Sequence, residues 1–548
     1  MNNLFLYFLL YVLIPFNLFS QGNFSFSSAF TNIAAPSIKE HLQILAADSL
    51  EGRSVGTKGG NLAAQYISEQ FSGFKLREIP NENSFYQNIP MHGSIPINTS
   101  ELTLISNNET MLLNYSEDYF LYRSGQQTFL PTPMPLVFVG YGIVAPEFDY
   151  NDYQSVDVEG KIVVYFDGEP YSNDKDYFDG EFPTIYSYPE SKRRIAIARG
   201  ASGTIQIPLN SFEGWNAVQK DFSFEDVTLA YTVSSNLSIL LNPSVAEKLF
   251  KGSNFSFNDL IRMHNDKKIE SFPLKTKVKF KGVFKERDFI APNVIGIVDG
   301  SDAELKNSYL IVSAHYDHLG IGQPVQNDSI YNGALDNALG VSVLLELAKA
   351  FSSLETKPKR SMLFIATTGE EKGLLGSSYY TENPIVPLYK TIANVNIDGV
   401  AMFKDFKSLV GIGAELSTLD NWLNSTAETY NLSLHDIPAQ FKRFDAFNKS
   451  DQLAFALAGI PSILVLEGTK NKSKSEEEVT EAFIKYYVNY YHTPFDDLNQ
   501  EIDYEAAAKH AKILFDLCYN LANSANTPEW REGAQFIHAR LRSIAEKK

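Results

Sequence analysis

Cysteine is almost absent from this sequence. The 548 residues contain a single cysteine, Cys518. An intrachain disulfide needs a pair of cysteines, and thiolate-rich zinc or iron–sulfur sites need several, so both kinds of site are excluded. Any bound metal must therefore be held by nitrogen and oxygen atoms from histidine and carboxylate side chains.

Positive charge is also scarce. There are 47 Lys and Arg residues against 65 Asp and Glu, and the formal net charge is −18. Proteins that bind nucleic-acid phosphates rely on clustered basic residues, so the composition argues against nucleic acid as a partner. With 44% hydrophobic residues the chain has a globular composition. At about 100–200 residues per domain, its length predicts roughly two to four domains.

Only one long apolar run occurs, LFLYFLLYVLIPFNLF at residues 4–19. A membrane-spanning helix needs about 20 apolar residues, and this run is shorter and contains Pro15 and Asn17. A small residue, Ser20, and a polar stretch follow, although no Lys or Arg precedes the run. The features predict a signal peptide at residues 1–20 and an exported protein, periplasmic or extracellular, without stable membrane insertion after cleavage. An uncleaved anchor and a buried helix are the alternatives.

Several common catalytic signatures are missing. The sequence contains no GxxxxGK[ST] phosphate loop, no GxSxG nucleophile elbow and no HExxH motif. Their absence disfavours a phosphate-loop nucleotide site and a serine hydrolase, and it excludes the HExxH class of zinc peptidase.

Hydrophobic periodicity divides the remaining chain into regions. Residues 38–71 show helical spacing on both sides of a glycine-rich loop, which predicts two helices around a turn. From about residue 100 to 285, short β-type runs between Pro, Gly, Asn and Asp clusters predict a mostly β domain. From about residue 292 onward, apolar strands alternate with helices, which predicts an α/β sheet covered on both faces. The highly charged stretch 470–481 is predicted to be a solvated loop.

The elements expected in the α/β region are short and well separated. The predicted strands and helices are, respectively, 309–314, 361–367, 392–397 and 462–466, and 341–351, 374–382, 417–430 and 504–522. Residues 274–284 are predicted to form a connecting strand.

Polar clusters follow these predicted strands. HYDH comes after the first strand, TGEE after the second and an aspartate after the third, while NGALDN precedes the clearest helix. Each cluster alone is typical of helix caps and solvated turns. In α/β sheets, however, ligands bind at the carboxyl ends of the strands, so the clusters are expected to converge. Imidazole and carboxylates without thiolate form a donor set suited to Zn²⁺, Mn²⁺ or Co²⁺.

These motifs resemble a known family. The segments SAHYDHLG, NGALDNALG, TTGEEKGLLGS, NIDG and YHTPFDD are similar in order and spacing to those of the co-catalytic zinc exopeptidases of peptidase clan MH, typified by bacterial leucyl aminopeptidases, aminopeptidase Y and glutamate carboxypeptidase. The segment PLVFVGYGIVAPEFDYNDY resembles part of a protease-associated domain inserted in such chains.

The resemblance implies a role for each matching residue. The implied ligands of two zinc ions, with Mn²⁺ or Co²⁺ as alternatives, are His315, Asp336, Glu371, Asp398 and His492. Asp336 matches the bridging carboxylate, and Glu370 matches the general base. Asp317 matches an acid that orients the first histidine, and Tyr491 matches an oxyanion-stabilising tyrosine of some members.

Three further residues complete the comparison with the family. His318 is not a family ligand and is predicted to be structural, whereas Asp496 is expected to support His492. The sequence departs from the family where Gln452 stands in place of a frequent histidine, beside Asp451 as a candidate pocket residue.

The sequence therefore predicts an α/β fold, a three-layer αβα sandwich with a mixed, largely parallel sheet, plus an inserted β-rich domain like the protease-associated domain. The predicted divisions are a signal peptide at 1–20, catalytic parts at 21–100 and 286–525, the inserted domain at 101–285 and a helical tail at 526–548. The expected function is a secreted zinc exopeptidase that acts on peptides with a metal-activated water, with an aminopeptidase favoured. Glutamate-carboxypeptidase-like or dipeptidase activity, a glutaminyl-peptide cyclotransferase and a non-catalytic receptor-like homologue remain alternatives.

Overall fold

The structure is a computed structural model of the chain. It describes residues 26–107, 109–121, 129–172, 174, 176–178, 180, 184–209, 214–215, 218–219, 222–233, 236–438, 441 and 445–547. The predicted signal peptide lies outside these residues. Within the described residues, no helix is both long enough and apolar enough to cross a membrane.

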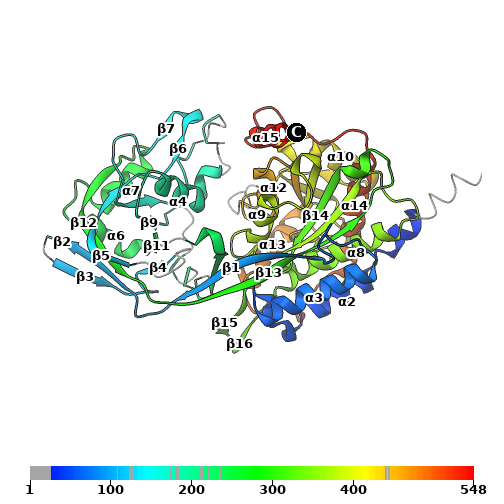
Figure 1. Cartoon of the computed structure of the whole chain (residues 1–548), viewed down its shortest axis with the longest axis horizontal. Helices are drawn as coiled ribbons and strands as arrows, with labels where there is room; N and C mark the ends of the chain where they lie inside the picture. Colours follow the sequence, from blue (N-terminus) through cyan, green and yellow to red (C-terminus); the bar gives the residue numbers. More distant parts are fainter. Residues whose placement is uncertain are drawn as a thin grey trace, which may run out of the picture.

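A nine-stranded mixed sheet forms the larger lobe (Figure 1). Its four central strands run parallel, and antiparallel pairs lie on either side of them. In spatial order the strands are β10 (Asp226–Leu229), β1 (Tyr86–Pro96), β13 (Phe284–Val298), β17 (Ser361–Thr367), β14 (Tyr309–His315), β18 (Thr391–Asn396), β21 (Ser462–Glu467), β19 (Ser408–Ile412) and β20 (Ser433–Leu434). The parallel centre places the carboxyl ends of β17, β14 and β18 at one edge.

Side-chain alternation along these strands builds the two outer layers. Leu310, Val312 and Ala314 of β14 pack into one core cluster, whereas Ile311 packs into another on the opposite face. Helices α2 (Ala35–Leu45), α3 (Lys58–Gly73), α8 (Leu339–Ser353), α10 (Leu419–Thr429) and α14 (Tyr504–Asn523) cover the first face. Helices α9 (Leu375–Glu382) and α12 (Gln452–Leu457) cover the second. The predicted three-layer αβα arrangement is confirmed.

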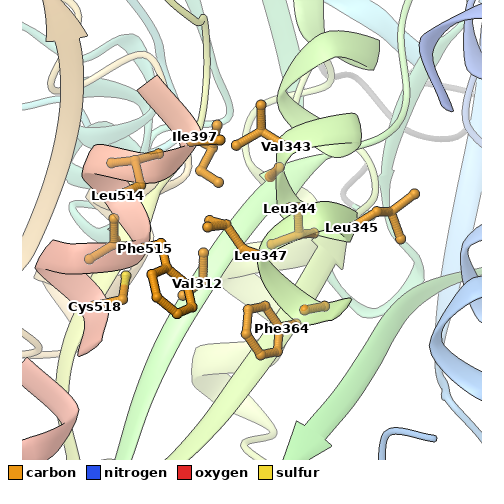
Figure 2. Packing of buried hydrophobic residues seen from close by; sticks show 14 of the residues in the cluster. Val312, Val343, Leu344, Leu345, Leu347, Phe364, Ile397, Leu514, Phe515 and Cys518 are labelled. Carbon is orange, nitrogen blue, oxygen red and sulfur yellow. The ribbon is translucent and has the colours of Figure 1, made fainter. Parts of the chain in front are cut away.

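The first core layer is dense around α8 and α14. Figure 2 shows Val343 and Leu347 of α8 facing Leu514 and Phe515 of α14 above the sheet. The free Cys518 is buried in the same layer, where burial raises the pKa of its thiol. The single cysteine therefore acts as a small apolar core residue.

An eight-stranded sheet forms the smaller lobe (Figure 1). Its strands are, in spatial order, β3 (Glu109–Leu113), β2 (Glu101–Ser106), β12 (Phe272–Lys281), β5 (Phe129–Phe138), β8 (Ile162–Phe166), β9 (Gly203–Ile207), β11 (Leu237–Leu241) and β4 (Tyr119–Leu121). This lobe also holds helices α4 (Pro189–Ala198), α6 (Ala246–Phe250) and α7 (Phe257–Asn265) and the short hairpin of β6 (Val144–Ala145) with β7 (Tyr150–Asn151). A second hairpin, β15 (Gly320–Val325) with β16 (Asp328–Tyr331), follows β14 of the larger lobe. The strand expected at 274–284 is divided between β12 and the start of β13.

The two lobes are linked by paired strands. The long antiparallel strands β1 and β13 pair from Tyr86 to Pro96 and run between the lobes in Figure 1. Strand β10 lies within the 101–285 segment, yet it pairs with β1 in the larger sheet. Arg287 of β13 donates to the Glu225 carboxylate beside β10, from Nε to Oε1 at 2.7 Å. The smaller-lobe segment therefore contributes an edge strand to the larger lobe.

One sequence prediction fails in the charged stretch 470–481. Helix α13 (Glu476–Asn489) begins inside it, with Ser475 as its N-cap and Glu478 completing a capping box. The acids occupy the first turn, where the helix dipole favours negative charge, so a high charge density here marks a helix start. A last helix, α15 (Ile537–Ala545), lies near the C-terminus.

Candidate metal centre

The sheet topology brings the predicted site residues together. β14 ends at His315, Glu370 and Glu371 follow β17, and Asp398 follows β18. Because these strands are parallel neighbours, their ends meet at one edge of the sheet. The remaining ligand candidates arrive from an irregular turn before α8 and from the loop after α13.

A first group of donors surrounds His315. Its Nε2 lies 3.3 Å from Asp336 Oδ1 and 3.3 Å from Asp398 Oδ1. The imidazole is buried, and these three side chains can each offer one ligand atom within a span of 4.8 Å. One nitrogen and two carboxylate oxygens match the donors that zinc takes in catalytic sites.

A second group surrounds His492. Its Nε2 lies 3.4 Å from Asp336 Oδ2 and 3.2 Å from Glu371 Oε2. Although it is close to both oxygens, this buried nitrogen makes no hydrogen bond of good geometry within the described residues. Asp336 presents one oxygen to each group, so its carboxylate stands between them. A buried histidine nitrogen that lies between two carboxylates without a hydrogen bond fits a site for cations, with the Asp336 carboxylate placed between the two groups.

The charges of the site also fit a cation. Burial would lower the pKa of His315, but Glu370 and Asp398 outweigh it and raise that pKa well above its usual value. Burial would likewise raise the pKa of Glu371, yet His492 and His318 hold it well below its usual range. The carboxylates thus stabilise positive charge among them, which a bound metal ion would also supply.

Asp317 contacts His315 chiefly through its backbone carbonyl. His315 Nδ1 lies 3.1 Å from the backbone oxygen of Asp317, and the Asp317 carboxylate is farther away at 3.9 Å. The Asp317 Oδ1 instead accepts a hydrogen bond from the Glu370 backbone at 3.2 Å. Asp317 thus contacts the histidine through its carbonyl and the Glu370 turn through its side chain, and burial raises its pKa to about 6.

Glu370 lies beside the ligand candidates and makes no close ion pair with the histidines among the described residues. Burial raises its pKa well above the usual range, opposed by His315 and reinforced by Asp398. A carboxyl group with a raised pKa both accepts and returns a proton more readily near neutral pH. The position and environment suit a proton-transfer group.

Tyr491 lies against the second group. Its ring stacks on His492, with ring centroids 3.9 Å apart and an interplanar angle of 17°. Burial and the nearby Asp336 and Glu371 carboxylates raise the pKa of its hydroxyl well above the usual range. The phenol is therefore neutral, while the residue as a whole is 37% exposed.

Asp496 supports Asp336 rather than His492, contrary to the sequence prediction. Its Oδ1 accepts from the Leu335 backbone and its Oδ2 from the Asp336 backbone, both at 3.0 Å. The hydroxyl of Tyr486 also donates to Oδ2, at 3.3 Å. The YHTPFDD motif therefore supplies both His492 and the aspartate that holds the turn carrying Asp336.

Asp451 is not a pocket residue. It is completely buried, and its Oδ2 accepts from Thr367 Oγ1 at 2.5 Å at the end of β17. Gln452 is buried as well, with its Oε1 accepting from Asn396 Nδ2 at 2.9 Å. Gln452, at which the sequence departs from the family pattern, is therefore buried against the ends of the central strands together with Asp451.

The comparison with family models agrees with this geometry. Residues 293–518 match the model of peptidase family M28. The chain carries a peptidase family M28 domain. The matched segment holds all five ligand candidates together with Glu370.

Similar proteins extend the likeness beyond the M28 domain. A probable zinc metalloprotease of Pyrenophora teres f. teres is 27% identical over 46% of this chain and 53% of its own length. The aminopeptidase NAALADL1 of Mus musculus is 29% identical over 49% of this chain and 37% of its own. The chain spans about half the length of the curated relatives it matches.

A solved structure is similar over nearly the whole chain. The aminopeptidase from Aneurinibacillus sp. strain AM-1 is 19% identical and aligns with a TM-score of 0.54, over 92% of this chain and 97% of that one. This likeness is one of fold, and it includes the region outside the M28 domain.

Arg53 supports the M28 domain from outside the matched segment, and sequence reasoning missed it. Its buried guanidinium donates to the carbonyls of Tyr316 at 2.8 Å, Gly333 at 2.9 Å, Leu45 at 2.7 Å and Asn332 at 2.5 Å. These carbonyls belong to the loops that carry His315 and Asp336 and to the end of α2. Burial lowers the pKa of Arg53 to about 10, opposed by carboxylates of the site.

A glycine allows this approach. Gly52 has a φ of +66°, and a Cβ there would lie 2.3 Å from the Tyr331 carbonyl oxygen. Glu51 and Arg53 are also left-handed, with φ of 50° and 53°. The only signal in the sequence was an arginine inside a glycine-rich turn, which also describes many exposed loops.

We expect Arg53→Lys to lower the free energy of unfolding by about 2–4 kcal/mol, because one ammonium cannot satisfy carbonyls on several sides of a planar guanidinium. The measurement is urea unfolding of chelator-treated protein. Arg77→Lys is the control, since Arg77 pairs with Asp299 where the side chains are 42% and 59% exposed. Its loss should stay below about 1 kcal/mol. Equal losses in the two variants would contradict the bracing role of Arg53.

Proposed function

We propose that the chain is a zinc-dependent exopeptidase that releases N-terminal residues from peptides. The observation that carries the proposal is the Asp336 carboxylate, with one oxygen toward His315 and the other toward His492. Together with Asp398 beside His315 and Glu371 beside His492, it would complete a nitrogen–oxygen donor set for two Zn²⁺ ions, with Mn²⁺ or Co²⁺ as alternatives. Aminopeptidases among the similar proteins support the choice of the N-terminal end.

The side chains have separate tasks in this proposal. When bound, the two zinc ions supply Lewis-acid activation of the attacking water and of the peptide carbonyl. Glu370 takes the proton from that water and returns it to the nitrogen of the leaving amine. The neutral Tyr491 hydroxyl donates toward the developing oxyanion in this proposal. Asp317 and Asp496 keep the histidine and the central carboxylate in place.

Export and the inserted domain belong to the same proposal. We infer that residues 1–20 direct the chain out of the cytoplasm and are removed. The 101–285 segment then acts as a protease-associated-like domain, supported by its own eight-stranded sheet and by its linkage to the catalytic lobe through β1 and β13.

The test compares aminoacyl 4-nitroanilides with their N-acetylated counterparts. We expect hydrolysis of the free-amine substrates only, complete loss of rate after treatment with a chelator, and recovery on adding zinc. The acetylated substrates are the matched control, because they differ only in the α-amine. Hydrolysis confined to acylated dipeptides would indicate a carboxypeptidase and refute the aminopeptidase proposal. Cyclisation of N-terminal glutamine without hydrolysis would indicate a cyclotransferase.

A further inference from the structure

His318 is a third imidazole at the metal centre. It lies three residues after His315 and is completely buried, with its ring centroid 5.7 Å from that of His492. The loop before Asp336 packs closely against the ring at Gly333, where an added Cβ would lie 2.4 Å from His318 Cγ. The ring is thus held between that loop and the carboxylate of Glu371.

The two oxygens of Glu371 have different partners. Oε1 lies 2.6 Å from His318 Nδ1, and Oε2 lies 3.2 Å from His492 Nε2. A carboxylate can only accept hydrogen bonds, so the proton of the shorter contact belongs to Nδ1. The Nε2 atom of His318 is buried without a hydrogen-bond partner within the described residues, so the imidazole is anchored at one nitrogen only.

We propose that His318 is a positioning residue that fixes the rotation of the Glu371 carboxylate and so directs a single oxygen toward the second metal position. The terminal torsion of a glutamate is broad and roughly two-fold, so the carboxylate alone does not select one orientation. A hydrogen bond of 2.6 Å to Oε1 removes that freedom and leaves Oε2 for the ion beside His492. Partners that orient ligands in this way commonly contribute to metal affinity. The inference rests on the proposed two-metal function.

An alternative use of the same side chain is direct ligation. His318, Asp336 and Glu371 can each offer a ligand atom within 4.8 Å of the others. The geometry favours positioning, because Nδ1 is engaged with a carboxylate that itself faces His492. The two uses predict different behaviour when an amide replaces the imidazole.

The test uses two variants of the full chain. His318→Asn keeps a nitrogen donor near the place of Nδ1, whereas His318→Leu keeps a similar bulk without any donor. Zinc is removed with a chelator, and the affinity for each of two zinc ions is measured by competition with a metal indicator. We expect His318→Leu to bind one of the two ions about 10- to 100-fold more weakly and the other ion unchanged. His318→Asn should recover most of that loss.

Two results would overturn the inference. Unchanged affinity for both ions in His318→Leu would remove any role of His318 at the site. Equal weakening in both variants would indicate that the imidazole itself ligates the ion. Should His318→Leu fail to fold, His318→Gln replaces it, because its amide extends one bond beyond the position of Nδ1 and should show the same loss.

The readout separates this inference from the proposed function. Metal affinity is measured without substrate, so a parent chain that binds two ions but hydrolyses no peptide would refute the exopeptidase and leave the role of His318 standing. A parent chain that binds one ion only would refute the two-metal site and the inference with it.

Discussion

Glu370→Gln is expected to lower kcat by about a thousandfold while the protein keeps both metal ions. Glutamine has nearly the shape of glutamate but cannot accept a proton, so the attacking water loses its base. Glu370 makes no contact with the ligand nitrogens comparable to that of Glu371, whose Oε2 lies 3.2 Å from His492 Nε2. The measurements are steady-state kinetics on an aminoacyl 4-nitroanilide and zinc content by mass spectrometry.

The neighbouring residue supplies the control. Glu371→Gln is the same chemical change one position later, yet it replaces a ligand candidate that also accepts from His318. We expect this variant to lose zinc as well as activity. Loss of zinc from Glu370→Gln during purification would show that Glu370 binds metal and is not the base.

The catalytic fold was largely predictable because its strands are buried on both faces. Strand β17 was predicted with its observed bounds, and β14 and β21 differ only at their C-terminal ends. Continuous apolar runs such as SMLFIAT are rare outside such sheets, and the helices between them carry clear apolar faces. Local pattern and tertiary environment agree here, which is the condition under which sequence reasoning works.

Elements that depend on distant contacts were not predictable. Helix α13 has only Val479 buried, so it lacks the apolar stripe that identifies a packed helix, and its acidic first turn resembles a solvated loop. Strand β10 is four residues long and has a place in the larger sheet only because β1 lies beside it. Neither α13 nor β10 can therefore be recognised from its local sequence.

The candidate site shows the same division. Its ligand candidates lie in recognisable motifs, three of them at or just after strand ends. The structure brings these three together with Asp336 and His492, which come from a turn and a loop. The supporting residues were misassigned or missed, because their partners are backbone atoms of remote loops. Asp496 accepts from the backbone of Asp336, and Arg53 donates to carbonyls more than 250 residues away, at Tyr316 and Gly333. A motif identifies the type of side chain at a position, but it does not identify the distant backbone groups to which that side chain hydrogen-bonds.

Asp336→Ala is expected to reduce the zinc content from two ions per chain to about one and to lower kcat/KM by at least about a hundredfold. The substitution removes both oxygens of the Asp336 carboxylate, one of which faces His315 and the other His492. The measurement is zinc content after dialysis against a weak chelator, together with kinetics on the same preparation.

Asp451→Asn is the matched control for that experiment. Asp451 is a second buried aspartate near the strand ends, but it accepts hydrogen bonds from Thr367 and Ser377 rather than facing the histidines. Its amide variant should keep both ions. A zinc content of two ions in Asp336→Ala would contradict the bridging role.

The expected content is one ion rather than none because each half of the site keeps part of its donors. After Asp336→Ala, His315 still faces Asp398, and His492 still faces Glu371. Two divalent cations held side by side would repel each other strongly, and the Asp336 carboxylate would offset this repulsion. Without it, the first ion to bind disfavours the second, whichever half it occupies. In the proposed two-metal site Asp336 thus couples the two positions, and its removal should leave two competing sites of lower affinity.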